Sequence, residues 1–424
     1  MDPNTQTIFA PETKLDQANS PTNFSFKTLS SKKRKMLIIF GIIFVLVSLA
    51  FIIGAIISSN SDKKVRLVIE NANNSYIAGD ISKARQDLES AYGEYPDNED
   101  VQAALIKVIA NQGNLSGDEK QKYDEAKKYI EDALKDNPNN VQVLLSVGYI
   151  EEVAGNYPKA LEYYDKALSM DSNNPEGWFH RGHVLYFQGD YVGGRTAIEK
   201  SYSLDNKDPL VLIAMGNIAY GESDLEKAYR YFLEASKISD TPVQIRSEAL
   251  TAASITRRLQ LIYMDESIAL AKQAVDLNPT FSPALGAYGY VLSINGRAAE
   301  GAEYLTKAIE SNPRISLNYH LGAMVLRMVG QYTDSVDYEK QAIEKVANDN
   351  TILGASAKAE VRSNYLYELA VTHTLNGGNT ETVALLSEAL SLNPMLKDNL
   401  VTDYETNGRF AELSSNLEFQ ALLL

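Results

Sequence analysis

A small residue recurs along this chain at a nearly fixed interval. Nine such residues are separated by 42, 34, 34, 34, 39, 34, 34 and 47 residues: Ala91, Ala133, Ala167, Ser201, Ala235, Ala274, Ala308, Ala342 and Ala389. A second residue, nearly always small, precedes each of them by seven positions, from Ala84 to Thr382. Five equal intervals are not expected from composition, and a fixed period indicates a repeat architecture. The length of 424 residues favours the same conclusion, because a single core rarely grows that large.

Each repeat has the pattern of two amphipathic helices. In residues 141–174, apolar residues three and four apart form two segments, which are separated by Ala154-Gly155-Asn156. Glycine permits the left-handed residue that commonly ends a helix. Glycines that we expect to end the first helix occur at Gly79, Gly113, Gly155, Gly189, Gly296, Gly330 and Gly377. Proline, often after asparagine, closes several units, as at Pro138 and Pro279.

A 34-residue unit of two helices with small residues at these positions resembles the tetratricopeptide repeat family. The first helix also shows the family's pattern of a large residue followed by a glycine, as in Leu144 and Gly148. The resemblance covers residues 65–396 and implies an all-α fold, a right-handed solenoid of about nine helical hairpins. Such hairpins stack because one of them cannot bury its apolar face alone. We expect residues 397–424, which have apolar residues at helical spacing, to form capping helices.

Three units depart from the period. Residues 99–140 contain eight extra residues, which we expect in the turn between the two helices. Residues 243–281 contain five extra residues, and Arg257-Arg258-Leu259-Gln260 stands where the turn glycine is expected. Residues 350–362 add thirteen before the last unit. Insertions in solenoids often lie near a binding face, and tolerated variation in length is the simpler alternative.

The amino-terminal residues predict a membrane anchor. Residues 1–35 are polar and carry little apolar periodicity, so we expect a disordered tail. Residues 36–58 contain no charged side chain and are long enough for one transmembrane helix. Six lysines and arginines precede this segment, which places the tail in the cytoplasm and the solenoid outside it. The predicted location is therefore the cell membrane, with a single pass.

The sequence contains few residues or motifs that are typical of catalysis or metal binding. The chain has no cysteine, and no phosphate-binding loop, nucleophile elbow or zinc-protease motif occurs. His180 and His183 could begin a metal site, but no third ligand has matching spacing. We therefore expect no enzyme activity, no catalytic residue, no cofactor and no metal. The net charge of −15 becomes −18 without the basic first 59 residues, which disfavours nucleic acid as a partner.

The resemblance also implies a binding face. In tetratricopeptide proteins the first helices line a concave groove that binds peptides. The residues at the groove-facing positions here are Tyr149, Phe179, His183, Tyr186, Asn217, Tyr220, Tyr290, His320 and Arg327. For each aromatic residue the alternative is packing against the next helix. The family's clamp for peptide carboxylates needs lysine and asparagine at such positions, and only Asn217 fits it.

These features predict a membrane-anchored scaffold for protein–protein interaction, with a tetratricopeptide groove outside the cytoplasm. Its partners would be protein or peptide ligands and, through residues 36–58, the membrane. A homo-oligomer is a further candidate. The alternative function is an accessory subunit of an envelope enzyme or of a complex that assembles pili or the cell wall or carries out secretion.

Overall fold

The structure is a computed structural model, which describes residues 61–116, 119–349, 352 and 355–424. The helical array is one unit that begins at Val65 and ends at Leu424. The predicted tail (1–35) and transmembrane helix (36–58) lie outside the described residues. Among the helices of the described part, none is both long enough and apolar enough to cross a membrane.

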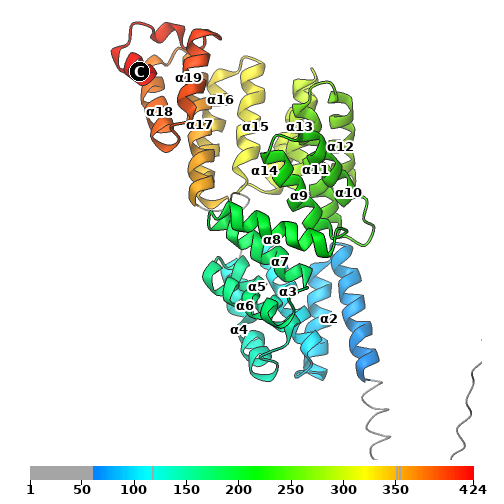
Figure 1. The fold of residues 1–424 in the computed structure, drawn as a ribbon. Coiled ribbons are helices and arrows are strands. Elements are labelled where there is room, and N and C mark those ends of the chain that lie inside the picture. Colours follow the sequence, from blue (N-terminus) through cyan, green and yellow to red (C-terminus); the bar gives the residue numbers. More distant parts are fainter. Residues whose placement is uncertain (1–60, 117–118, 350–351, 353–354) are drawn as a thin grey trace, which may run out of the picture. The chain divides into compact units, whose positions relative to one another are not determined.

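The array consists of consecutive helical hairpins (Figure 1), and the described residues contain no β-strand. Within this unit, helical residues 65–77 pair with α2 (Ile81–Glu94) to form the first hairpin. The other hairpins are α3 (Glu99–Ser116) with α4 (Glu119–Asp136), α5 (Val141–Val153) with α6 (Tyr157–Met170), α7 (Pro175–Phe187) with α8 (Tyr191–Leu204), α9 (Pro209–Gly221) with α10 (Leu225–Ser236), α11 (Val243–Leu259) with α12 (Met264–Leu277), α13 (Ser282–Ile294) with α14 (Ala298–Ser311), α15 (Ser316–Met328) with α16 (Tyr332–Lys345), and α17 (Ala355–Leu375) with α18 (Asn379–Leu392). Each hairpin packs against the next one in chain order, as a repeat solenoid requires.

Local residue chemistry sets most helix ends. The side chain of Asn140 accepts a hydrogen bond from the Val143 amide at 3.1 Å, and Asp190 caps α8 in the same way. Six of the predicted turn glycines adopt a positive φ: Gly79, Gly155, Gly189, Gly296, Gly330 and Gly377. The prediction that Gly113 ends a helix is wrong, because α3 continues through it to Ser116.

The unit 99–140 also differs from the expectation of a longer turn. Its helices α3 and α4 have 18 residues each, and only residues 117–118, which are not described, stand between them. Similarly, α11 has 17 residues and α17 has 21, whereas α5, α7 and α9 have 13. Among the described residues, much of the extra length therefore lies in helical turns, whose backbone hydrogen bonds are satisfied within the helix.

The recurring small residues lie where the two helices of a hairpin meet. All nine residues of the first set and all nine of the second are buried. Gly182 of α7 and Gly194 of α8 illustrate the close approach: a Cβ added to either would lie 2.9 Å from the carbonyl oxygen of the other, and Gly289 and Gly301 of α13 and α14 approach more closely still. The period in the sequence is thus the period of close helix contacts, which large side chains would prevent.

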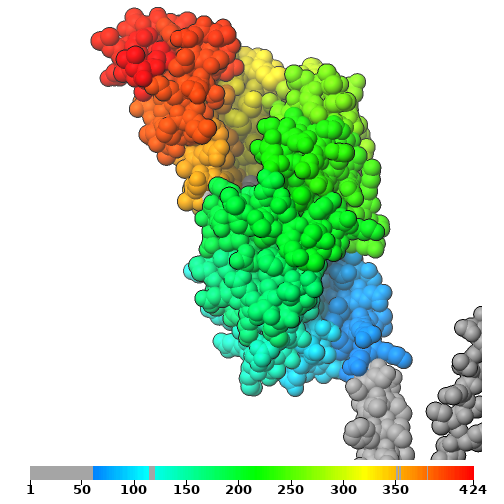
Figure 2. Space-filling view, viewed as in Figure 1, coloured from blue at the N-terminus to red at the C-terminus, as the bar shows by residue number. Residues whose placement is uncertain are grey.

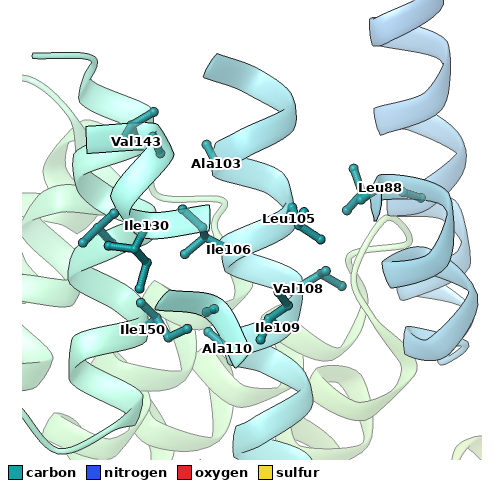
Figure 3. Close-up of a cluster of buried hydrophobic side chains, with 14 of the residues drawn as sticks. Leu88, Ala103, Leu105, Ile106, Val108, Ile109, Ala110, Ile130, Val143 and Ile150 are labelled. Carbon is teal, nitrogen blue, oxygen red and sulfur yellow. The ribbon is translucent and has the colours of Figure 1, made fainter. Parts of the chain in front are cut away.

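Apolar residues between hairpins form a chain of core clusters. In the first cluster, Leu88 of α2, Ile106 and Ile109 of α3, Ile130 of α4 and Ile150 of α5 pack together (Figure 3). Each cluster contains residues from successive hairpins, so that a repeat is stabilised mainly by its neighbours.

The last cluster includes the carboxyl-terminal residues. Here α19 (Leu396–Glu405), the 3₁₀ helix η3 (Ala411–Leu413) and α20 (Leu417–Leu423) lie against α17 and α18 (Figure 2). Phe410 and Phe419 are fully buried there, whereas Leu417 is exposed. These residues cover the apolar surface that the last hairpin would otherwise expose.

Candidate partner-binding face

The first helices of neighbouring hairpins contact one another over much of the array. These contacts join α3 to α5, α5 to α7, α9 to α11, α11 to α13 and α13 to α15. Polar side chains of α3, α5, α7 and α11 form hydrogen bonds, an ion pair and longer-range charge interactions between these helices. We call this surface the first-helix face and define it by Asn111, Tyr149, Glu152, His183 and Glu248.

The centre of the first-helix face is a buried carboxylate between two histidines, which we call the Glu152 cluster. Glu152 of α5 is 6% exposed, and its Oε1 lies 2.6 Å from Nδ1 of His183. Its Oε2 lies 3.2 Å from Nδ1 of His180 and accepts a hydrogen bond of 2.6 Å from the hydroxyl of Tyr164. His180 is buried, whereas the side chain of His183 is 40% exposed. One carboxylate of α5 thus fixes two side chains of α7 and one of α6.

The histidines keep this carboxyl group ionised. Burial alone would raise the pKa of Glu152, because it removes water from the charged form. The charges and hydrogen bonds of His180 and His183 outweigh that effect and lower the pKa to about 2. Burial and the nearby carboxylate raise the pKa of the Tyr164 hydroxyl well above its usual value, so this hydroxyl stays a hydrogen-bond donor.

Two further interactions cross the first-helix face. The hydroxyl of Tyr149 donates a hydrogen bond of 2.7 Å to Oδ1 of Asn111 on α3. Lys107 of α3 forms an ion pair of 2.6 Å with Glu176 of α7, two hairpins further along the chain. On α11, Glu248 is exposed; loss of water raises its pKa, and His183 opposes this only in part. The face therefore combines an amide, a phenol, an imidazole and two carboxylates.

A second histidine–carboxylate cluster lies in the carboxyl-terminal hairpins, and we call it the Glu339 cluster. Nδ1 of His320 on α15 lies 2.6 Å from Oε1 of Glu339 on α16, and Glu339 is 1% exposed. The His320 ring stacks on Tyr365 of α17 with 4.4 Å between ring centroids. Burial raises the pKa of Glu339, and the single histidine opposes this only in part.

His320 also borders a cleft of about 400 Å³ between α17 and α19. Asp403 of α19 accepts hydrogen bonds from the Tyr367 hydroxyl at 2.7 Å and from the Asn407 amide at 2.7 Å, and Arg409 approaches it to 3.1 Å. The other lining residues are Asn364, Glu368, Leu396, Asn399 and Thr402. This cleft is polar, and its charges already pair with one another.

The residues that were predicted to line one groove do not all lie on one surface. Tyr149 and His183 belong to the first-helix face, and the Phe179 ring stacks on His183 at 5.8 Å. Phe179 itself is largely buried against the next hairpin, which was the alternative for each aromatic residue. Tyr186 packs over Gly194 of α8, between the two helices of its own hairpin.

The remaining predicted residues lie further along the chain. Asn217 and Tyr220 are exposed on α9. The Arg258 guanidinium lies over the Tyr290 ring at 5.2 Å. Arg327 forms an ion pair of 2.7 Å with Glu368, and so links α15 to α17, while His320 belongs to the Glu339 cluster.

Glu152 is the important residue that the sequence prediction missed. No third ligand for His180 and His183 was expected at matching spacing, but the carboxylate comes from the preceding first helix, 28 and 31 residues earlier. These separations are one 34-residue repeat less six and three residues, which is one to two helical turns, so the period did contain the signal. In the described residues no group of three or more histidines, aspartates or glutamates is arranged to hold a metal ion.

Comparison with known proteins supports the repeat assignment. The sequence profile described as "Tetratricopeptide repeat" matches residues 115–175 and 154–209. No curated protein matches the chain.

Solved structures with this fold resemble the chain at low sequence identity. A monomeric mutant of IFIT1 with Gppp-AAAA has a TM-score of 0.55 and 12% identity, over 84% of this chain and 85% of that one. PilF of Pseudomonas aeruginosa has a TM-score of 0.41 and 17% identity, over 47% of this chain and 89% of its own. PilW, a type IV pilus biogenesis factor, has a TM-score of 0.42 and 16% identity, over 47% and 91%. Residues 115–209 thus match tetratricopeptide repeats, and the helices of the described residues form an all-α repeat solenoid.

Proposed function

We propose that this chain is a protein–protein interaction scaffold, and that its first-helix face binds protein or peptide segments. The observation that carries this proposal is the Glu152 cluster. Its hydrogen bonds hold His183 in one place while the imidazole stays partly exposed. Side chains that are fixed before binding lose less conformational entropy when a partner arrives.

The chemistry of the face suits a peptide. Tyr149, His183 and Asn111 offer hydrogen-bonding groups beside aromatic surface, and such surfaces bind extended or helical segments well. The face has no arrangement of nucleophile and base that would support turnover, so we propose a binding role and no catalysis. We further propose that residues 36–58 hold the solenoid at the membrane, outside the cytoplasm.

Affinity capture with the full-length chain tests the binding role. His183→Ala combined with Glu248→Ala removes two side chains of the first-helix face, one partly exposed and one exposed. The matched control combines Lys200→Ala with Glu234→Ala, which removes exposed side chains of the second helices α8 and α10. We expect the variant of the first-helix face to lose captured proteins that the control retains. Equal capture by both variants would contradict a role for this face.

Two further measurements separate the other parts of the proposal. A complex of fixed stoichiometry with an enzyme or an export component would support the accessory-subunit alternative, whereas a scaffold should capture several proteins in variable ratio. Protease treatment of intact cells should digest the solenoid. A solenoid that is cleaved only after lysis would contradict the proposed topology.

A further inference from the structure

Glycine follows asparagine at three places in the chain: Asn295-Gly296, Asn376-Gly377 and Asn407-Gly408. Asparagine is a labile residue, and most of all before glycine, which has no side chain to keep its backbone nitrogen away from the carboxamide. When that nitrogen attacks the carboxamide carbon, a five-membered succinimide forms. All six of these residues are exposed, so access to water does not distinguish the three sites. The hydrogen bonding of the glycine amide does.

The glycine amides of the first two sites are held at the ends of their helices. The Gly296 amide donates a hydrogen bond of 3.2 Å to the carbonyl oxygen of Ser293, and the Gly377 amide donates one of 3.1 Å to that of Thr374. The same bond to the residue three positions earlier occurs at the other glycines that end first helices, such as Gly155. A nitrogen whose proton is held in this way is a poor nucleophile, because its attack requires the loss of that proton.

Gly408 lies between α19 and η3 and differs from these glycines. Its φ is also positive, at +64°, but its amide makes no hydrogen bond with any described residue. Among the described residues, the carboxamide of Asn407 bonds only to Oδ1 of Asp403, at 2.7 Å. Because Asn407 is exposed, water can replace this single bond, and the side chain can then rotate toward the Gly408 nitrogen. Of the three sites, this is the one at which the fold leaves the reacting nitrogen unprotected.

We propose that Asn407 is a site of spontaneous modification. The Gly408 nitrogen loses its proton and forms a bond to Cγ of Asn407, and the bond from Cγ to Nδ2 breaks. The Nδ2 group leaves as ammonia after it takes up, through water, the proton that Gly408 lost. A water molecule then opens the succinimide at either of its two carbonyl carbons. The product is aspartate, or isoaspartate, in which the backbone runs through the former side-chain carbon. This inference does not depend on the function proposed for the first-helix face.

The modified residue faces a buried carboxylate of the carboxyl-terminal helices. Asp403 of α19 is 7% exposed and lies 3.1 Å from Nη1 of Arg409. Conversion of Asn407 removes a hydrogen-bond donor to Asp403 and places a second negative charge beside it. Two carboxylates this close repel each other strongly where water is largely excluded. The chain continues from here to the fully buried Phe410, so the repulsion should loosen the packing of η3 and α20 on the last hairpin.

Peptide mapping of the aged full-length chain tests the modification. The purified chain is kept at mildly alkaline pH, where amide nitrogens lose protons more readily, and the aspartate and isoaspartate peptides are separated and identified by mass spectrometry. The matched control is Asn295-Gly296-Arg297, which has the same three residues as Asn407-Gly408-Arg409. We expect Asn407 to react at least about fivefold faster than Asn295, since one net hydrogen bond must first open at the control site. Equal rates in the folded chain, or an unmodified Asn407, would overturn the inference.

The same measurement in concentrated urea separates the effect of the fold from that of the local sequence. Once the chain is unfolded, neither glycine amide is held by a helix end, so the two Asn-Gly-Arg segments should react at similar rates. A difference between them that persists in urea would show that the hydrogen bonding of the glycine amide is not its cause.

Asn407→Asp tests the consequence of the modification. Hydrogen exchange of the full-length chain measures how firmly α20 is packed, and Asn295→Asp is the control for an added charge in an exposed turn. We expect the amides of α20 to exchange at least about tenfold faster in Asn407→Asp, because the new carboxylate repels Asp403. Asn295→Asp should leave this exchange unchanged. Unchanged exchange in Asn407→Asp would overturn the loosening of the carboxyl-terminal helices.

Discussion

The two histidine–carboxylate clusters have similar geometry and opposite electrostatics. In each, a nearly fully buried glutamate lies 2.6 Å from Nδ1 of a histidine on another helix. Glu152 faces a second histidine, and its pKa is lowered to about 2. Glu339 contacts one histidine: burial raises its pKa and Glu368 adds to this, while His320 and Arg327 oppose it only in part. The second histidine strengthens the attraction of opposite charge at Glu152, which there outweighs the loss of water.

Because of this difference in pKa, Glu152 stays ionised at a lower pH than Glu339 does. Above mildly acidic pH, Glu152 is a carboxylate that joins α5, α6 and α7. Glu339, between α15, α16 and α17, holds a proton more readily when folded than when unfolded. Because burial of an unbalanced charge is costly, the Glu339 cluster is the weaker electrostatic link of the two.

Glu152→Gln should have the largest effect on stability. The amide keeps the shape but removes the charge that faces two histidines and the Tyr164 hydroxyl. Removing one partner of a buried ion pair typically costs about 3 kcal/mol or more. Urea unfolding of the full-length chain at neutral pH, followed by circular dichroism, measures this loss. The exposed Glu234→Gln is the control and should change little; an equally small effect of Glu152→Gln would contradict the importance of the charge.

Glu339→Gln should lower the free energy of unfolding much less than Glu152→Gln, although Glu339 is as deeply buried as Glu152. Burial already disfavours its ionised form, so that the neutral amide replaces a group whose charge gave little net stability. We expect a loss of less than about 1 kcal/mol at neutral pH, the typical value of one neutral hydrogen bond. The same urea titration measures it. A loss as large as that of Glu152→Gln would show that the two clusters are equivalent.

The pH dependence of unfolding should have opposite signs for the two variants. The pKa of Glu152 is depressed, so its contribution is complete above the unfolded pKa near 4.5 and is lost as pH falls toward about 2. The pKa of Glu339 is raised, so the folded state binds its proton more tightly, and its contribution grows as pH falls. The free-energy difference from wild type should therefore shrink on acidification for Glu152→Gln and increase for Glu339→Gln. Parallel pH profiles would contradict the assigned shifts.

The sequence predicted the fold well because its periodic small residues lie where paired helices pack closely. Ala167 and the equivalent small residues are buried in every hairpin, and Gly155 ends a first helix as expected. The inserted residues were misplaced because length alone does not distinguish a longer loop from added helical turns. Residues 104–116 of α3 show that a helix can continue through a glycine when both neighbouring turns stay helical.

The site was harder to predict, because it depends on contacts between repeats. The positions of Tyr149 and His183 follow from the family pattern, but the role of Glu152 follows only when adjacent first helices are placed side by side. The same limit applies to Leu261: the sequence showed a missing glycine, but not that leucine takes up its left-handed conformation. Repeat position thus predicts burial better than it predicts hydrogen-bond partners.

His183→Phe should make the first cluster resemble the second, with one histidine beside the buried glutamate. Phenylalanine keeps the ring next to Phe179 but removes one of the two groups that lower the pKa of Glu152. We expect that pKa to rise, because burial then opposes only His180. The loss of stability should be about 1 kcal/mol, since His183 is partly exposed and solvent screens its interaction. The carboxyl resonance of Glu152, followed by NMR during an acid titration of the full-length chain, reports the shift; an unchanged pKa would mean that His180 alone keeps Glu152 ionised.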